Sequence, residues 1–406
     1  MLALEGTKII DLTQYAPGSL CTMILADHGA QVVKVEALTD GEKGTTSRWG
    51  ASGTEEDNRK ELAIDALNRN KKSIRLNLKS EPGRKVFGKL ARTADVLVES
   101  FRPGVVKRLG VDYEAVSRVN PQLVYCSMTG YGQNGPYRDL PGHDINYISV
   151  GGALGLIGEK GRAPAIPLNI VADFAGAGVQ GAISILLGLA ARGKTGKGQY
   201  IDFSFTDSVV YLMGYFIRFP FAGMPMTRGQ GAMAGEYPFY RTYKTSDGRY
   251  VTLGALEPWL WANLCNAIGK PEFIPHHFKG KEHFANEAKP EEWQLISSEM
   301  ERIFLTRTRE EWFDFLAGKD VPIAKVYDLD ELPSDPQLTH RQMFIDVEDP
   351  LAGKVKQVGM PAKFSQTPGG VRSLAPIPGQ HTEEILSELG YTADEIAGLR
   401  QDRVVA

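Results

Sequence analysis

The sequence predicts a protein of the α/β class, with a Rossmann-like large domain built on a parallel sheet. Three observations support this prediction. Short β-rich runs alternate with helix-like runs over the first third of the chain, the strand-like runs are apolar throughout, and 406 residues exceed what one ordinary core organises. We therefore expect a large domain from residues 1–220 and 326–406 and a smaller α+β domain over 221–325.

The first third of the chain supplies most of the expected sheet. Its strands are KIIDLTQ, AQVVKVEAL, KKSIRLNLKS, DVLVESF and LVYCSMTG, and SLCTMILADHG is a helix between the first two. A second helix, SEPGRKVFGKLARTA, has Ser80 as a possible cap and Pro82 in its first turn, and a third is expected over 112–119. The GxGxxG fingerprint is missing after the first strand, so a dinucleotide cofactor is not indicated.

Two segments between the expected elements admit more than one interpretation. Residues 39–69 form a long polar connection, which is either a surface loop near a ligand or a plain solvated insertion. Residues 220–238 are rich in Gly, Met and Pro and suit either a substrate lid or an inert linker. After them, an Asp-Gly turn predicts a β-hairpin, and helices are expected near WLWANLCNAIG, EEWQLISSEMERIFL, TREEWFDFLAG and, close to the end of the chain, TEEILSELG.

Composition narrows the functional classes. The net charge is −3, from 46 basic and 49 acidic residues, which gives no reason to expect nucleic acid or an anionic membrane as partner. The beginning of the chain lacks a secretory signal pattern, and the longest apolar run, 182–191, is about half a membrane span. The three cysteines have no metal-like spacing. We therefore expect a protein of the reducing cytoplasm.

Residues 142–178 contain the strongest candidates for chemistry. His143 lies in a Gly-His-Asp turn, and Asp173 opens the small, apolar run 174–191, which predicts a buried helix. A helix N-terminus offers unpaired N–H groups that can steady a developing oxyanion. We interpret His143 and Asp173 as two acid/base groups facing one substrate carbon. By contrast, no GxSxG motif supports a hydrolase, and His276, His277 and His283 are expected to be solvated rather than metal ligands.

Many segments in the same order resemble the family III CoA-transferase superfamily. They include IIDLTQYAPGSLCTMILADHGAQVVKVE, NRNKKSIRLNLKS, ADVLVESFRPGVVKRLG, NPQLVYCSMTGYGQNGPY, GKTGKGQYIDFS and PIPGQHTEEILSELGY. Within the superfamily, GHDINYIS, NIVADFAGAG and GALEP are similar to the α-methylacyl-CoA racemase branch. Formyl-CoA transferases share an Asp at the position of Asp173. They typically have Tyr where this chain has His143, Gln where it has Ala16, and a run of glycines where it has RGQGAMAG.

The resemblance implies an enzyme that inverts the α-carbon of 2-methylacyl-CoA thioesters by two-base proton transfer through an enolate. Asp173 would need a raised pKa, which burial can supply, and N–H groups at the start of its helix would hold the enolate oxygen. The alternative is a transferase that uses Asp173 to form an acyl anhydride and then an aspartyl-CoA thioester. A CoA-binding scaffold without activity is the third hypothesis.

Further residues and partners are also implied by the resemblance. Glu257 would pair with His143, and Asn169 and Tyr147 would line the substrate pocket. The anionic CoA would bind Lys71, Lys72, Arg102 and Arg108, with Phe101 beside the adenine. The family commonly has Arg at the position of Ala37, so the phosphate contacts differ in detail. We expect no metal and no cofactor beyond the CoA moiety, and a homodimer whose two chains interlock.

Overall fold

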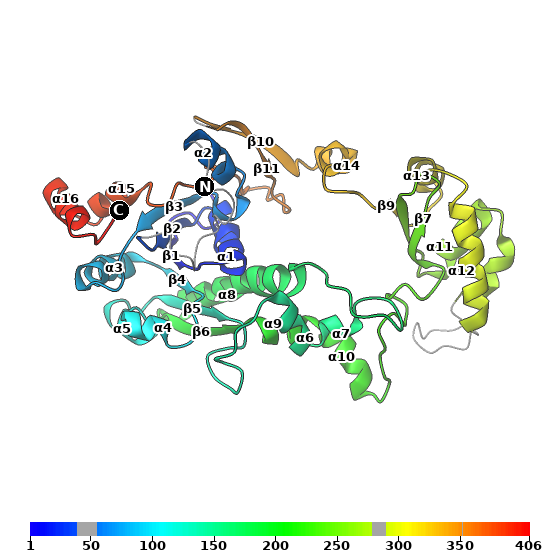
Figure 1. Cartoon of the computed structure of the whole chain (residues 1–406), viewed down its shortest axis with the longest axis horizontal. Helices are drawn as coiled ribbons and strands as arrows, with labels where there is room; N and C mark the ends of the chain where they lie inside the picture. The colour runs from blue at the N-terminus through cyan, green and yellow to red at the C-terminus, as the bar shows by residue number, and fades with distance from the viewer. Residues whose placement is uncertain (39–54, 278–289, 351) are drawn as a thin grey trace. The chain divides into compact units, whose positions relative to one another are not determined.

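The computed structural model describes residues 1–38, 55–277, 290–350 and 352–406, which form two compact units (Figure 1). Unit 1 comprises Met1–Gly151, Leu168–Met213 and Pro333–Ala406, and unit 2 comprises Gly152–Pro167 and Gly214–Leu332. The division differs from the expected boundaries at 152–167, 214–220 and 326–332, which pack with the small unit. Arg228 of the Met/Gly-rich segment fixes this stretch by donating hydrogen bonds to the carbonyls of Gly155 and Arg162, at 3.2 and 2.6 Å.

Unit 1 is built on a six-stranded parallel sheet, as the apolar strand-like runs predict. The strand order is β3-β2-β1-β4-β5-β6, and every neighbouring pair is parallel. The strands are β1 (Lys8–Leu12), β2 (Gln31–Glu36), β3 (Lys71–Arg75), β4 (Val96–Glu99), β5 (Val124–Thr129) and β6 (Gln199–Ser204). The order reverses between β1 and β4, so the carboxyl ends of these two strands mark the place where α/β sheets commonly bind ligands.

Helices cover both faces of this sheet (Figure 1). One face packs on α3 (Glu81–Thr93), α5 (Tyr113–Val119), α15 (Thr382–Glu388) and α16 (Ala393–Gln401), whose apolar side chains share one core with β1, β3 and β4. The other carries α1 (Ala16–Asp27) and α8 (Gln180–Thr195). The expected cap of α3 is present, since Ser80 Oγ accepts from the N–H of Gly83 at 3.1 Å.

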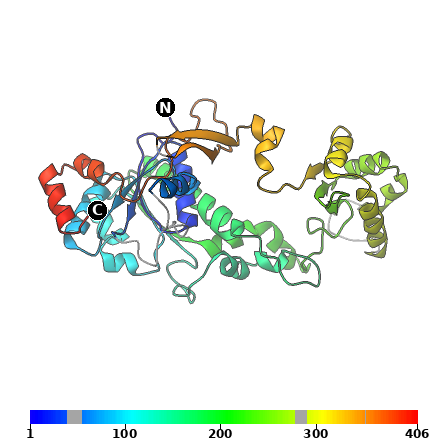
Figure 2. The same ribbon diagram turned by 45° about the horizontal axis from the view of Figure 1, so that its top comes forward.

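The C-terminal part of the chain joins unit 1. In Figure 2 the red helices α15 and α16 lie beside the blue and cyan elements of the N-terminal half. The N–H of His381 donates to Ser73 O, and a bridge connects Val405 to Leu76. The sequence analysis did not anticipate α14 (Pro336–His340), the β10–β11 hairpin (Phe344–Asp349 and Gly353–Val358) or α16.

The expected long connection over 39–69 is only in part irregular. Residues 39–54 lie outside the described residues, whereas α2 (Glu55–Ala63) and the short helix η1 (Ala66–Asn68) form its second half. The interpretation of the whole stretch as a loop is therefore wrong for that half. The α2 sequence is so polar that it carries no apolar periodicity from which a helix could be predicted.

Unit 2 has its own aromatic core. The antiparallel sheet consists of β7 (Tyr240–Lys244), β8 (Tyr250–Gly254) and β9 (Ile323–Lys325), and α11 (Pro258–Ala267), α12 (Pro290–Phe304) and α13 (Arg309–Ala317) pack on it. Gly248, at φ +79°, makes the predicted hairpin turn. His277 is buried against Phe239, with ring centroids 4.5 Å apart, so the expectation that it is solvated is wrong.

One helical segment, Ile170–Thr195, is long and apolar enough to cross a membrane when only the described residues are searched. It consists of η2 (Ile170–Val179) and α8, and it packs in unit 1 against α1 and the strands β5 and β6. A core helix of a soluble protein passes the same test of length and composition. This segment is therefore weak evidence for a membrane span.

Candidate active site

His143 and Asp173 both belong to unit 1, and each lies at the beginning of a helical segment. His143 is exposed and caps α6 (Asp144–Val150), where its own N–H donates to Asn146 Oδ1 at 3.0 Å. Asp173 lies in the first turn of η2, which has π-helical geometry and continues into α8. Since α6 contacts η2, the two predicted acid/base residues come from adjacent elements.

Small residues in η2 allow α1 to approach closely. A Cβ atom added to Gly178 would lie 2.5 Å from Leu20 Cδ2, and one added to Gly176 would lie 2.9 Å from Val171 O. These distances are too short for any side chain without a local shift. Gly178 of the FAGAG run therefore lets the segment that carries Asp173 pack closely against the helix that follows β1, and Gly176 leaves room for the backbone of η2 itself.

The side chain of Tyr147 is fixed by a hydrogen bond and by close packing against two glycines. Its hydroxyl donates to Gly142 O at 2.6 Å, and its ring occupies the space that side chains at Gly130 and Gly142 would need. Burial raises the pKa of Tyr147, and the charge of Asp173 raises it further, whereas Arg102 lowers it. The predicted pocket residue Tyr147 is thus close enough to Asp173 and Arg102 for their charges to act on it.

The Asp173 carboxyl has the electrostatic environment that acid/base work needs. Burial raises its pKa above the usual value, and the charge of Asp144 adds to this effect. A hydrogen bond from Asn169 Nδ2 to Asp173 Oδ2, at 3.2 Å, and the charge of His143 act in the opposite direction. The direction of this shift makes a protonated Asp173 easier to reach near neutral pH.

Asp144 is the site residue that the sequence analysis missed. It is buried, and its Oδ2 accepts from the N–H groups of Ala172 and Asp173 at 2.7 and 2.8 Å. These are the N–H groups at the start of the Asp173 helix that we expected to hold an oxyanion. That expectation is wrong for both, because a carboxylate already occupies them. An acidic residue at the first position of α6 was the only signal in the sequence.

The two lysines expected on a basic rim lie at the amino end of β3, away from the carboxyl edge where ligands bind. Lys71 is wrong as a rim residue, because its side chain is 0% exposed and its ammonium pairs with Asp11 at 3.1 Å. Lys72 is partly exposed, but its ammonium pairs with Glu384 and Glu388 of α15, at 2.8 and 3.1 Å. Both ammonium groups are therefore already paired with carboxylates, and neither is expected to bind a CoA phosphate.

Other predicted CoA residues follow the carboxyl end of β4. Phe101 is half-buried against the core, while Arg102 and Arg108, the latter on α4 (Val105–Leu109), are exposed. Lys79, which the sequence analysis did not select, is an exposed cation beyond the carboxyl end of β3. Exposed basic side chains in this region therefore include Lys79, Arg102 and Arg108, rather than the lysine pair that begins β3.

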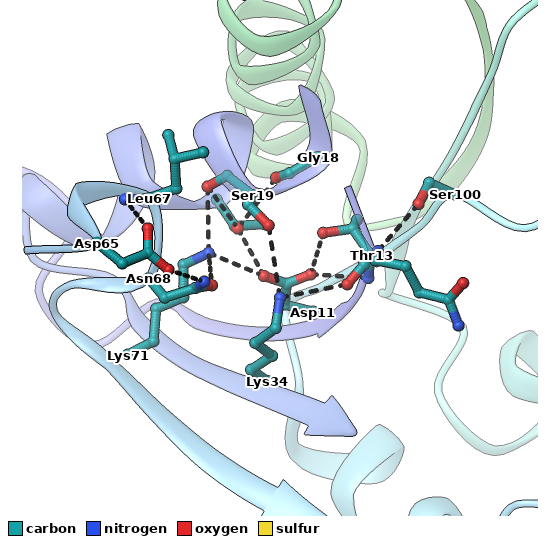
Figure 3. Close-up of polar contacts among 12 residues, drawn as sticks. Asp11, Thr13, Gly18, Ser19, Lys34, Asp65, Leu67, Asn68, Lys71 and Ser100 are labelled. Carbon is teal, nitrogen blue, oxygen red and sulfur yellow. Dashed lines mark hydrogen bonds and ion pairs between the residues drawn. The ribbon is translucent and has the colours of Figure 1, made fainter. Parts of the chain in front are cut away.

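Lys71 belongs instead to a buried polar cluster at the end of β1 (Figure 3). Asp11 accepts from the N–H and hydroxyl of Thr13 and from the hydroxyl of Thr22, at 2.6–2.8 Å. Lys71 Nζ donates to Ser19 O at 3.1 Å, and Lys34 Nζ donates to Thr13 O at 3.3 Å. The cluster thereby connects the turn between β1 and α1 to β2 through Lys34 and to β3 through Lys71.

The charges of this cluster stabilise one another. Burial alone would raise the pKa of the Asp11 carboxyl, but Lys71 and Lys34 hold that pKa well below its usual range. Burial lowers the pKa of the Lys71 ammonium to about 8, and the attraction of Asp11 opposes the decrease. Both groups are therefore charged at neutral pH, as a hydrogen-bonded buried ion pair requires.

Glu99 is a second buried carboxyl, at the carboxyl end of β4. It accepts from the N–H of Phe101 at 2.8 Å and from Ser127 Oγ, which in turn accepts from Gln133 Nε2 at 2.8 Å. Burial raises the pKa of Glu99 to about 7, although both hydrogen bonds to it lower the pKa. The run DVLVESF predicted the strand but gave no sign that its Glu is buried.

We expect the free energy of unfolding to fall as pH rises through the titration of Glu99. The folded chain holds a proton on Glu99 up to pH about 7, whereas the unfolded chain, with a pKa of 4.5, has released it. Between these values the folded state binds more protons, so stability decreases with pH, by up to about 3 kcal/mol. Chemical denaturation of Glu99→Gln from pH 4 to 8 should show a flatter dependence. Glu114→Gln, at an exposed position, should not, and equal curves for the two variants would contradict the assignment.

Glu257 belongs to unit 2, where it occupies the cap position of α11 and is half-buried. Its carboxylate is thus carried by a different unit from His143 and Asp173. The pairing of Glu257 with His143 stays a prediction.

Comparisons with known proteins agree with this architecture. The sequence profile described as CoA-transferase family III matches residues 4–382. The human alpha-methylacyl-CoA racemase is 33% identical over 100% of this chain and 98% of its own length. A formyl-CoA:oxalate CoA-transferase of Escherichia coli O6:H1 is 32% identical over 99% of both chains.

A solved structure of the same fold comes from Brucella suis. This CAIB/BAIF family protein is 28% identical, has a TM-score of 0.79, and covers 96% of this chain and 99% of its own. Because the family profile spans nearly the whole sequence and full-length relatives exceed 30% identity, the assignment does not depend on any single motif. The chain is a member of CoA-transferase family III.

Proposed function

We propose that this protein is an α-methylacyl-CoA racemase-like isomerase, which inverts the α-carbon of 2-methylacyl-CoA thioesters. The observation that carries the proposal is the pairing of two different acid/base groups on adjacent elements. His143 begins α6, and Asp173, with its raised pKa, lies in the first turn of η2. An imidazole and a carboxyl group can each release or take up a proton, so the two groups can exchange proton-donor and proton-acceptor roles.

In the proposed mechanism one group removes the α-proton, and the C–H electron pair moves to the thioester carbonyl to give an enolate. The other group then delivers a proton to the opposite face of the same carbon, and the carbonyl re-forms. His143 and Asp173 serve as base and acid for one enantiomer and exchange these roles for the other. Asn169 holds the Asp173 carboxylate through its 3.2 Å hydrogen bond, and Tyr147 shapes the pocket beside it.

The enolate oxygen needs hydrogen-bond donors other than those first expected. Two N–H groups in the first turn of η2, those of Ala172 and Asp173, donate to Asp144, so we assign this role to the first N–H groups of α6, at Asp144 and Ile145. The N–H groups of the first helical turn precede the hydrogen bonds inside the helix and are free to bind an anion. Their place beside His143 puts them next to the reacting carbon.

The CoA moiety binds at the carboxyl edge of the sheet, in our proposal. Arg102 and Arg108 are exposed there and supply charge for the phosphates, while Phe101 lies beside the adenine. No metal and no other cofactor takes part. The three cysteines are buried free thiols, which fits the cytoplasmic location that we propose.

A second copy of this chain is the partner that we propose, in an interlocked homodimer. One side of the η2–α8 segment exposes Val179, Ile183, Leu186 and Leu187, with Leu187 65% exposed. Their spacing places all four on one helical face, which is an apolar surface of the kind that associates. Sedimentation of the purified protein tests the dimer, and a monomer at micromolar concentration would contradict it.

The alternative is a CoA-transferase that uses Asp173 as nucleophile, which the similarity to the formyl-CoA:oxalate CoA-transferase supports. Incubation with a chiral 2-methylacyl-CoA in deuterated buffer separates the hypotheses. The racemase exchanges the α-hydrogen for deuterium without any acceptor acid and gives both enantiomers. CoA transfer to an added carboxylate without α-exchange would support the transferase and contradict the racemase. CoA binding with neither reaction would leave a scaffold.

A further inference from the structure

Asp144 connects the two elements that carry the acid/base pair. As the first residue of α6 it directly follows His143, and its side chain reaches the beginning of η2, where Oδ2 accepts from the N–H groups of Ala172 and Asp173. One carboxylate oxygen thus bridges two residues that are far apart in sequence. Any movement of α6 relative to η2 would break at least one of these hydrogen bonds.

Among the residues that the structure describes, no group donates a hydrogen bond to the second oxygen of this carboxylate. Asp144 is 4% exposed, and its Oδ1 is a buried side-chain atom with no hydrogen bond. A carboxylate that only capped η2 could turn its other oxygen to solvent or to a donor, as surface caps do. The charge of this carboxylate, which the two N–H groups of η2 stabilise, instead lies close enough to Asp173 to act on its carboxyl group.

We propose that Asp144 is a positioning residue of the acid/base pair: its carboxylate fixes the turn that carries Asp173 relative to His143 and places a negative charge beside Asp173. This inference rests on the proposed function, because it assigns Asp144 a role in the same site. Asp144 need not touch the substrate through its side chain. Asp144 acts by holding Asp173 in place and by favouring the protonated form of the Asp173 carboxyl group.

The groups that act on Asp173 all belong to two elements. His143, Asp144 and Tyr147 come from α6, and Asn169 caps η2 itself. Further along η2, Leu20 from α1 lies near Gly178 and Ser208 from α9 (Phe205–Leu212) donates to Gly176 O, and both side chains are uncharged. Asp144 is therefore the negative charge whose removal should lower the pKa of Asp173 without deleting a proton-transfer group.

Two substitutions at Asp144 separate its charge from its hydrogen bonds. Asp144→Asn keeps an oxygen that can accept from the N–H groups of Ala172 and Asp173 but removes the charge. We expect kcat for α-deuterium exchange of 2-methylacyl-CoA to change by less than about tenfold, because positioning is retained. The limb of the pH profile that reports Asp173 should move to lower pH, since the neighbouring negative charge is gone.

Asp144→Ala removes both effects. We expect kcat to fall about 100-fold with KM little changed, because the reacting groups lose alignment while the CoA contacts remain. Amide hydrogen exchange of residues 170–179 should become faster, and this measurement does not depend on any activity. The matched control is Asp112→Asn, which changes the cap of α5, where Asp112 accepts from the N–H of Ala115 at 3.0 Å. It should leave kcat, the pH profile and the exchange of residues 170–179 as in the unchanged chain.

The inference is overturned if the pH profile of Asp144→Asn and the amide exchange of Asp144→Ala both match those of the unchanged chain. If Asp144→Ala does not fold, the nearly isosteric Asp144→Asn decides through its pH profile. Failure of the proposed racemase function would give a result different from failure of the inference about Asp144. The unchanged chain then transfers CoA without α-exchange, and the same profile is measured on transfer, because Asp173 is the reacting group in both reactions.

Discussion

Replacing Lys71 by methionine is expected to lower the free energy of unfolding by about 3–5 kcal/mol, the cost of breaking a buried ion pair from one side. The ammonium of Lys71 is 0% exposed and donates to Asp11 and to Ser19 O. Methionine fills similar space but leaves the Asp11 carboxylate buried with Lys34 as its only nearby cation in this cluster. The turn between β1 and α1 also loses one of its ties to β3.

Lys72→Met is the matched control, one residue along the same strand. The side chain of Lys72 is 40% exposed, and its ion pairs with Glu384 and Glu388 lie at the surface, so its loss should cost less than about 1 kcal/mol. Urea denaturation at pH 7 measures both variants. Similar midpoints for Lys71→Met and Lys72→Met would show that the buried pair contributes no more than a surface pair.

The same two lysines show why parts of the site could not be predicted from the sequence. Neighbouring residues of a strand point to opposite faces, so a Lys-Lys pair at the start of β3 places one side chain inward and the other outward. The periodicity of the strand does not show which of the two lysines is buried. The buried lysine is the one that can pair with Asp11 of β1, and β2 lies between β1 and β3. The sequence does place both lysines at the amino end of the predicted strand, but it does not show that the ammonium of Lys71 pairs with Asp11.

More of the sheet than of the candidate site could be predicted from the sequence. Strands of a parallel sheet are short β-rich runs, most of them apolar, and the five strands of the first third of the chain were predicted from the sequence. The predicted cap Ser80 marked the start of α3, because capping depends on residues close in sequence. The polar helix α2 was missed because it buries no apolar stripe. Asp144 was missed because its acceptor role depends on N–H groups 28 and 29 residues further along the chain.

Replacing Asp173 by asparagine is expected to lower kcat for racemisation by about 100- to 10,000-fold, the usual contribution of a positioned acid or base. His143→Gln should have an effect of similar size, because each group is needed once in every inversion. Ser149→Ala is the matched control on α6. Its hydroxyl is exposed and donates to Ile145 O at 2.6 Å within the same helix, so kcat should stay within about twofold.

The pattern of deuterium exchange in these two variants carries more information than the loss of racemisation. If two bases work on opposite faces, Asp173→Asn still lets His143 remove and return the α-proton on its own face, so one enantiomer exchanges without inverting. His143→Gln should show the same behaviour with the other enantiomer. A transferase predicts a different pair of results, because Asp173→Asn then removes the nucleophile and His143→Gln leaves CoA transfer largely intact. Opposite stereochemical preferences in the two variants would therefore require both side chains to face one carbon. Neither the family assignment nor the adjacency of α6 and η2 requires this arrangement by itself.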